Sequence, residues 1–344
     1  MPSAYRVPGL FVPHLEAFVS RKGGDVDGFY TAAQLNQQTF LAHEETLSED
    51  QFYALVEYAR AVCSSPAFGL EIGQQFNLGS FGLLSRALMS CASLREFAKM
   101  LERYSVLVLP MVQFSTHETA EHFIVEERAF SRYPELNQLI FEATISFASK
   151  VTHLLLGRNV VVDKVMCQFE APENESLLRN SINAKVSFGA DQNRIYIQRA
   201  FVDLPLVTAN PTDARVTKEE CEKALIRSQQ TQTLVASVLG HLRYYLDASP
   251  SSADVATKLN MTDRTFRRKL SQEGSSYREL LQSVRKEMAV YYLEHTQLQI
   301  AQIAQKLGYA ETSNFRAAFK QWTGDSPRQW RQLRQISRTA PRSQ

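Results

Sequence analysis

Apolar residues recur three and four positions apart in three stretches of the first part of the chain, residues 47–63, 81–104 and 136–156. Residues at this spacing lie on the same side of a helix. The pattern therefore predicts three core-facing helical stretches.

Short runs of β-branched and aromatic residues follow a different pattern. They occupy residues 123–125, 160–169, 186–188 and 195–197, and glycine and asparagine bound several of them. Such runs between turn formers are typical of strands. Helices mixed with short strands predict an α+β fold for this part of the chain.

The last part of the chain has a helical pattern throughout. Apolar residues at helical spacing cover residues 234–246, before Pro250, and again residues 277–293. We find no strand pattern that competes with them, so this part is expected to be all-α.

Residues 203–217, DLPLVTANPTDARVT, separate the two patterns. Their two prolines and the Asn-Pro step favour extended or turning backbone. Thr217 and Glu220 then have the spacing of a capping box, which predicts that a helix begins there. We expect an α+β domain over 1–206, a linker over 207–231, an all-α domain over 232–335 and a flexible tail over 336–344.

The all-α part contains an internal repeat, over residues 252–273 and 300–322. Phe266 in the first copy matches Phe315 in the second, each followed by an arginine. Each copy reads as a short helix, a tight corner and a second helix. This is the pattern of the helix-turn-helix module, whose second helix can enter a DNA major groove.

The corners and ends of the two copies also correspond. Asn260 and Gly308 stand at the corners, and both residue types tolerate left-handed backbone. Thr262 follows the first corner as a candidate N-cap, and Gly274 and Gly324 close the two copies.

The second helix of each copy has one apolar and one polar face. Phe266 and Leu270 should face the core in the first copy. The exposed face then carries Arg264, Arg267, Arg268 and Ser271, and in the second copy Thr312, Ser313, Arg316 and Lys320. A guanidinium can donate two parallel hydrogen bonds to guanine O6 and N7, so these faces are candidates for reading bases. A solvated basic surface is the alternative for any single helix, but two copies in register favour DNA.

Charge is unevenly distributed along the chain. From residue 241 onward the chain has 17 Lys and Arg residues and 9 Asp and Glu residues. The whole chain, by contrast, is nearly balanced, with 38 Lys and Arg and 36 Asp and Glu. A basic last third favours a polyanionic partner. The helix over 277–293 would span about 25 Å, which can hold the two modules near the ~34 Å between successive major-groove faces. On it Arg285 and Lys286 are candidates for phosphate contacts, with a solubilising role equally open.

Residues 250–293 and 300–331 resemble the signature segment of the AraC/XylS-type bacterial transcription regulators, over roughly residues 232–335. The resemblance implies seven helices, promoter DNA as partner and activation through RNA polymerase. It places Arg264, Arg267 and Arg268 at base- or phosphate-facing positions of the first recognition helix, and Thr312, Ser313 and Arg316 at those of the second. Thr262 is a further candidate for a phosphate contact. The family often has Ser and then Arg after the matched Phe, whereas Phe315 is followed here by Arg316 and Ala317.

Residues 68–104 and 186–206 resemble the arabinose-binding N-terminal domain of one subgroup of that family. The resemblance implies an α+β sensor and dimerisation domain, hence a homodimer. It also implies a small-molecule effector, such as an amino acid or another small metabolite. Arg86, Arg103 and Tyr104 are candidates for holding its carboxylate, and surface arginines at helix ends are the alternative. The other possibility is a regulator or architectural protein without a ligand, whose N-terminal domain serves only for dimerisation.

Catalytic and metal-binding patterns are not found in the sequence. Ser64-Ser65, His43-Glu44-Glu45 and the pair His117 and His122 lack the spacing of a nucleophile elbow or a zinc helix. The four cysteines form no CxxC pair, which favours buried free thiols. We expect neither an enzyme nor a cofactor or metal. Without an apolar run of membrane-spanning length, a cytoplasmic, nucleoid-associated protein is expected.

Overall fold

The computed structural model describes residues 6–38, 40, 46–131, 133–157, 162–172, 175–182, 184–231, 233–259, 261–296 and 298–339. The chain divides into two compact units, Met1–Gln230 and Thr231–Gln344. Each unit has its own core and is described by itself.

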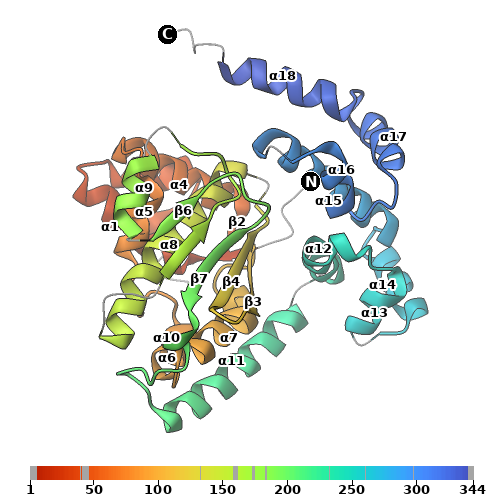
Figure 1. Cartoon of the computed structure of the whole chain (residues 1–344). Coiled ribbons are helices and arrows are strands. Elements are labelled where there is room, and N and C mark those ends of the chain that lie inside the picture. Colours follow the sequence, from red (N-terminus) through yellow and green to blue (C-terminus); the bar gives the residue numbers. More distant parts are fainter. Residues whose placement is uncertain are drawn as a thin grey trace. The chain divides into compact units, whose positions relative to one another are not determined.

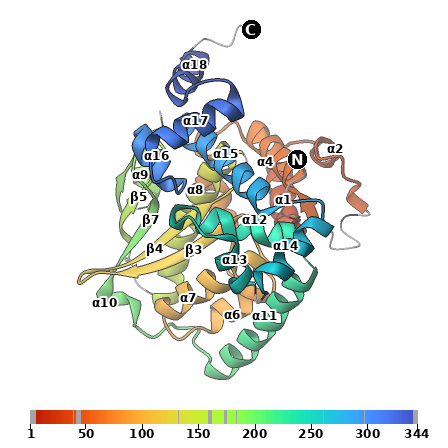
Figure 2. The ribbon, with the colours of Figure 1, turned by 90° about the vertical axis from the view of Figure 1, so that its right-hand side faces the viewer.

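A five-stranded sheet lies at the centre of the first unit, with strand order β3-β4-β7-β5-β6 (Figure 1). Its strands are β3 (Val112–Glu118), β4 (His122–Ala129), β5 (Val162–Met166), β6 (Lys185–Ser187) and β7 (Asn193–Gln198). All neighbouring pairs are antiparallel except β5 and β6, which are parallel. β3 and β4 form a hairpin (Figure 2). In β4, Phe123, Ile124 and Val125 are all buried, so both faces of the strand are covered over this stretch.

Helices surround this sheet. They are α1 (Val12–Arg21), α2 (Val26–Ala32), α4 (Glu49–Cys63), α5 (Phe68–Gln75), α6 (Leu83–Ser90), α7 (Leu94–Tyr104), α8 (Pro134–Leu156), α9 (Glu175–Ile182) and α10 (Arg199–Val202). This unit also contains two 3-10 turns, Gly9–Phe11 and Ser105–Leu107. A small antiparallel sheet is formed by β1 (Arg6–Pro8) and β2 (Thr46–Ser48). The α+β prediction is confirmed.

Helix α8 is the central helix of this unit and packs closely against α5. Gly73 of α5 permits the close approach, because a Cβ at that position would lie 2.8 Å from the Ala143 Cα. Glu135–Leu156 is long and apolar enough to cross a membrane by length and composition alone, but half of its apolar window is buried inside the unit. We interpret it as a core helix.

Two of the predicted elements differ in detail from those observed, and one strand was not predicted. The stretch 81–104 forms two helices, because α6 ends at Ser90 and a new helix, α7, begins at Leu94. Ser93 caps α7, and its side chain accepts a hydrogen bond from the Glu96 amide. The strand predicted over 160–169 is β5, and residues 160 and 161 lie outside the described residues. β3 was not predicted, since its sequence VQFSTHE lacks a continuous apolar run.

The predicted linker contains a long helix, α11 (Pro211–Thr231). The Asn210 side chain accepts a hydrogen bond from the Asp213 amide at 3.1 Å, and Pro211 takes the first helical position. The Asn-Pro step thus begins a helix, because proline suits the first turn, where its missing N–H is not needed. The capping box at Thr217 is wrong: Thr217 is buried inside the helix and its hydroxyl donates to the Asp213 carbonyl at 2.7 Å.

The second unit is all-α, as predicted. Its helices are α12 (Leu234–Tyr244), α13 (Ser252–Lys258), α14 (Asp263–Gln272), α15 (Tyr277–His295), α16 (Ile300–Lys306), α17 (Thr312–Thr323) and α18 (Pro327–Thr339), with a 3-10 turn at Leu246–Ala248. Its core is built around Phe266, Phe315 and Phe319, none of which is exposed. Residues 336–339 of the predicted tail belong to α18, and the last five residues lie outside the described ones.

Candidate nucleic-acid interface and effector cavity

The first helix-turn-helix module consists of α13 and α14. Thr262 caps α14 as predicted, its hydroxyl accepting from the Thr265 amide at 3.3 Å. α13 begins with a capping box between Ser251 and Asp254. Gly274, which follows the C-terminal end of α14, has a left-handed φ of +73°. Asn260, predicted at the corner, lies outside the described residues.

α14 has the two faces predicted for it. Phe266 and Leu270 are fully buried, whereas the opposite face is exposed along its length, at Arg264, Arg267, Arg268 and Ser271. Arg267 Nε lies 2.9 Å from Asp263 Oδ2, one turn earlier, and its side chain remains 66% exposed. A hydrogen bond from Ser252 lowers the pKa of Asp263, and the Arg267 guanidinium lowers it further. Arg267 is therefore oriented along the helix face.

The second module, α16 and α17, has a left-handed glycine at its corner, as predicted. Gly308 has a φ of +70°, and a Cβ there would lie 2.5 Å from the Leu246 carbonyl oxygen. Phe315 and Phe319 are buried. The polar face carries Thr312, which is half-buried, and the exposed Ser313, Arg316 and Lys320.

α15 joins the modules, and its two predicted phosphate contacts have partners inside the unit. Arg285 donates to the carbonyls of Leu307 at 2.9 Å and Gly308 at 3.0 Å, and its guanidinium lies 4.4 Å from the centre of the Tyr309 ring. Lys286 donates to the Trp322 carbonyl at 3.1 Å. These bonds attach the second module to α15, so the geometry gives Arg285 and Lys286 a bracing role in place of the phosphate contact expected from sequence.

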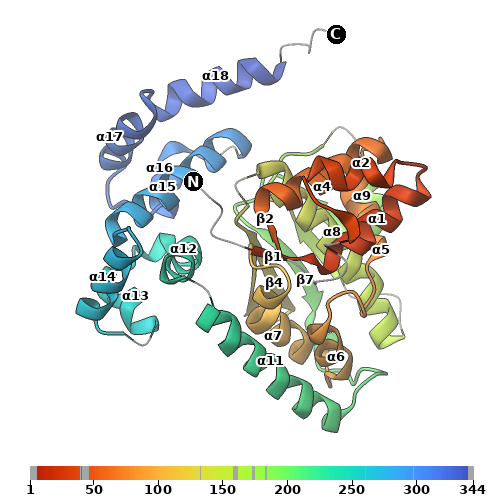
Figure 3. The same cartoon turned by 180° about the vertical axis from the view of Figure 1, so that it is seen from behind.

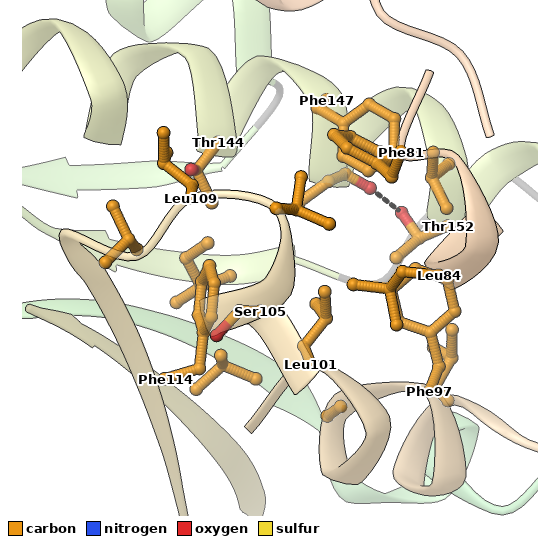
Figure 4. Close-up of a pocket in the computed structure, with 18 of the residues that line it drawn as sticks. Phe81, Leu84, Phe97, Leu101, Ser105, Leu109, Phe114, Thr144, Phe147 and Thr152 are labelled. Carbon is orange, nitrogen blue, oxygen red and sulfur yellow. Dashed lines mark hydrogen bonds between the residues drawn. The ribbon is translucent and has the colours of Figure 1, made fainter. Parts of the chain in front are cut away.

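The first unit contains two adjacent apolar cavities, of about 150 Å³ and 110 Å³. They share five wall residues: Phe11, Phe81, Leu109, Thr144 and Phe147. Figure 4 shows the larger one, whose labelled side chains are carbon except for the hydroxyls of Ser105, Thr144 and Thr152. The Thr152 hydroxyl donates to the Ala148 carbonyl at 2.8 Å. Among the described residues, no charged side chain lines either cavity.

The three predicted ligand residues all bind α11, the exposed Arg86 and Arg103 from the surface and Tyr104 from a buried position. Arg86 Nη2 lies 3.0 Å from Asp213 Oδ1. Arg103 donates to both oxygens of Glu222, at 3.0 and 2.7 Å, and the Tyr104 hydroxyl donates to the same carboxylate at 2.9 Å. The Arg103 guanidinium lowers the pKa of Glu222. Figures 1 and 3 both show α11 running beside α6 and α7. Neither cavity is lined by these three residues.

Helix α7 contacts both the larger cavity and α11. Leu94, Phe97, Ala98 and Leu101 line the larger cavity. Arg103 and Tyr104, at its C-terminal end, bind α11. One helix therefore forms a wall of the cavity and also holds α11.

Sequence reasoning missed a buried acid beside the cavity, Glu127 on β4. It is 2% exposed and stands opposite Phe114, a wall residue, in the β3–β4 register. Neither carboxyl oxygen has a hydrogen-bond partner among the described residues. Burial raises the pKa of Glu127 to about 8, and the Thr144 side chain acts in the opposite direction. On its face of β4, Glu127 lies between the apolar Val125 and Ala129, and this position was the available signal.

The residues tested for catalysis form structural contacts where the structure describes them. His122 Nε2 lies 3.0 Å from Asp163 Oδ2, and His117 Nε2 lies 4.0 Å from Glu126 Oε2. Residues 43–45 lie outside the described ones. The described residues contain no cluster of three metal-ligating side chains, and the four cysteines are free, three of them buried.

A chain with paired helix-turn-helix modules and a separate α+β unit has the organisation of a DNA-binding transcription regulator. Residues 23–206 match the family described as "Arabinose-binding domain of AraC transcription regulator, N-term", and residues 255–333 match a helix-turn-helix domain family. The chain belongs to the AraC family of transcription regulators.

Curated relatives have the same character. An uncharacterized HTH-type transcriptional regulator of Mycobacterium tuberculosis is 30% identical over 82% of this chain and 83% of its own length. The ornithine utilization regulator of Pseudomonas aeruginosa is 27% identical over 96% of this chain and 97% of its length. The urease operon transcriptional activator of Escherichia coli is 40% identical over 23% of this chain and 26% of its length. These relatives are regulators, and the protein is not an enzyme.

Proposed function

We propose that this DNA-binding regulator is an activator that binds promoter DNA as a homodimer in the cytoplasm, under the control of a small molecule held in the first unit. The observation that carries the proposal is the repeated module, in which two helices bury phenylalanines and leave a polar face exposed. Activation is supported by the similarity to the E. coli urease operon transcriptional activator, and contact with RNA polymerase is its proposed means.

The polar faces of α14 and α17 supply the proposed DNA contacts. Arg264, Arg267 and Arg268 offer planar donors suited to guanine edges, and Ser271 a hydroxyl. α17 offers Thr312, Ser313, Arg316 and Lys320, with fewer charges and more hydroxyls, so the two helices read different half-sites. Thr262 is the N-cap of α14 and its hydroxyl donates to Thr265 Oγ1 at 3.0 Å, so the proposed phosphate contact of Thr262 would take the place of this bond.

The spacer helix sets the distance between the two reading faces. α15 has 19 residues and is therefore about 28 Å long. With its flanking turns it can hold two helices near the ~34 Å that separate successive major-groove faces. Arg285 and Lys286 support this arrangement by attaching α16 and α17 to the rod.

Effector control is proposed to run through α7. A ligand in the larger cavity would contact Leu94, Phe97 or Leu101 on one face of α7. A small shift of this helix would change the Arg103–Glu222 contact with α11, and α11 leads into the DNA-binding unit. The cavity replaces Arg86, Arg103 and Tyr104 as the proposed ligand site, because those side chains already hold the carboxylates of α11.

A footprint of the full chain on its promoter tests the DNA-binding part of this proposal. We expect protection of two successive major grooves on one side of the duplex. Arg267→Ala should remove protection in one groove and Arg316→Ala in the other. Arg215→Ala, a surface arginine of α11 paired with Glu219, is the control and should change neither. Protection of a single groove, or loss of both grooves with either variant, would contradict the arrangement.

A further inference from the structure

The larger cavity identifies the chemical class of the effector. Resting on the proposed function, in which an effector occupies the first unit, we propose that this effector is an uncharged, mainly apolar ring compound with one hydroxyl or carbonyl group. It is not an amino acid or another carboxylate. Its ring occupies the space between α7 and α8, and its polar group faces Thr144.

The size of the space favours a single ring. The larger cavity measures about 150 Å³, and the smaller, about 110 Å³, shares with it the walls made by Phe81, Phe147 and Thr144. An apolar cavity of roughly 150 Å³ stays dry and holds a molecule of the size of benzene. Phe81 and Phe147 meet edge to face at 5.0 Å between ring centres, and Figure 4 shows both at the wall. Aromatic walls of this kind favour an aromatic guest.

The walls exclude a charged ligand. No charged side chain of the described residues lines either cavity. Moving an ionised carboxylate or ammonium into an apolar space without a partner costs several kcal/mol or more. The nearby arginines that could pair with a carboxylate, Arg86 and Arg103, are occupied by Asp213 and Glu222.

Glu127 is a buried acid that lies beside the cavity, opposite the wall residue Phe114. Its carboxyl is buried, has no hydrogen-bond partner among the described residues, and interacts with the side chain of Thr144, which lines both cavities. A buried carboxyl without a cationic partner is neutral and can donate a proton in a hydrogen bond. Thr144 therefore presents a hydroxyl that can accept from Glu127 and donate to a ligand oxygen.

Two probes with the same ring test this assignment on the full chain. Benzyl alcohol and benzoate differ only in their polar group, and their binding can be measured by calorimetry and by saturation-transfer NMR. We expect benzyl alcohol to bind at least about tenfold more tightly than benzoate, because only benzoate carries a charge into the apolar space. Equal or tighter binding of benzoate would overturn the proposal, as would no binding of benzyl alcohol.

Substitutions locate the bound ring. Ala98→Leu adds bulk to the cavity wall on α7 and should weaken benzyl alcohol about tenfold or more, while Ala61→Leu, the same change on an exposed position of α4, should leave it unaltered. Thr144→Val conserves shape and serves if Ala98→Leu does not fold. It should retain toluene and lose the preference for benzyl alcohol over toluene. Unaltered binding in the folded variant would place the ring elsewhere and overturn the proposal.

A parallel measurement of promoter binding keeps the two ideas separate. If the chain binds promoter DNA but no neutral ring, the ligand class is wrong and the DNA-binding function stands. If it binds benzyl alcohol but protects no promoter groove, the proposed function fails while the cavity assignment stands.

Discussion

Arg103 on α7 and Glu222 on α11 are joined by two hydrogen bonds, of 3.0 and 2.7 Å, between a guanidinium and both oxygens of one carboxylate. Helix α7 also forms part of the wall of the larger cavity. The pair therefore stands between the proposed effector and the helix that leads to the DNA-binding unit.

Arg103→Gln tests this connection. Both side chains of the pair are more than a third exposed, so we expect the free energy of unfolding to fall by less than about 1 kcal/mol. The induction ratio of a reporter promoter, with and without effector, should fall by a much larger factor. Arg60→Gln breaks a similarly exposed pair with Glu57 and is the matched control. An unchanged induction ratio in Arg103→Gln would separate α7 from the response.

Arg267→Ala tests base reading by α14. Loss of a bidentate base contact should weaken promoter binding by about 1 to 3 kcal/mol and leave non-specific binding nearly intact. Fluorescence anisotropy on promoter and random duplexes at one salt concentration provides the measurement. Equal losses on both duplexes would reassign Arg267 to a phosphate.

Gly308→Ala tests the corner of the second module. The φ of +70° and the nearby Leu246 carbonyl leave no room for a Cβ, so we expect a loss of at least about 2 kcal/mol in the free energy of unfolding. Gly274→Ala is the control, because its φ is +73° but nothing lies within 4 Å of the added Cβ. It should cost only about 1 kcal/mol. Urea unfolding of both variants measures the difference, and equal losses would show that crowding at Gly308 does not matter.

Glu127 predicts a pH dependence of stability. Its pKa is raised by burial from 4.5 to about 8, so between these values the folded chain holds a proton that the unfolded chain has released. Stability from this group is complete below about pH 4.5 and is lost as the pH rises towards 8. Each unit of this shift corresponds to about 1.4 kcal/mol.

Glu127→Gln should remove this dependence. We expect the melting temperature of the wild type to fall relative to that of the variant between pH 5 and pH 8. The buried Glu142, whose pKa is raised to about 7, titrates in both proteins and cancels in the difference. If the melting temperatures of the two proteins changed in parallel between pH 5 and pH 8, Glu127 would already be ionised in the folded chain.

The sequence predicted those parts of the molecule that depend on neighbours along the chain. The faces of α14 and α17 follow from the spacing of Phe266, Leu270, Phe315 and Phe319, and Gly308 marks a corner by its type. β3 was missed because its half-exposed residues lack an apolar run, and the start of α11 was misplaced at Thr217 because the Asn210-Pro211 step can either end or begin a helix.

The cavity could not be predicted for a different reason. Its walls come from segments between residues 11 and 197, and only the tertiary fold brings them together. Arg86 and Arg103 lie close to the wall residues Leu84 and Leu101 in sequence, yet their side chains bind α11 while the apolar residues form the cavity. The sequence therefore pointed to two helices that line the cavity, but to side chains on the faces that bind α11.

The double use of α7 also constrains how this protein can evolve. A mutation that reshapes the cavity face of α7 to accept a new effector would also shift its contacts with α11, so ligand preference and basal promoter output would change together. Substitutions on the α8 side, at Thr144 or Ala148, alter the cavity and leave the contacts between α7 and α11 in place. Drift of specificity among descendants of this gene should therefore accumulate on α8 first, with α7 retained.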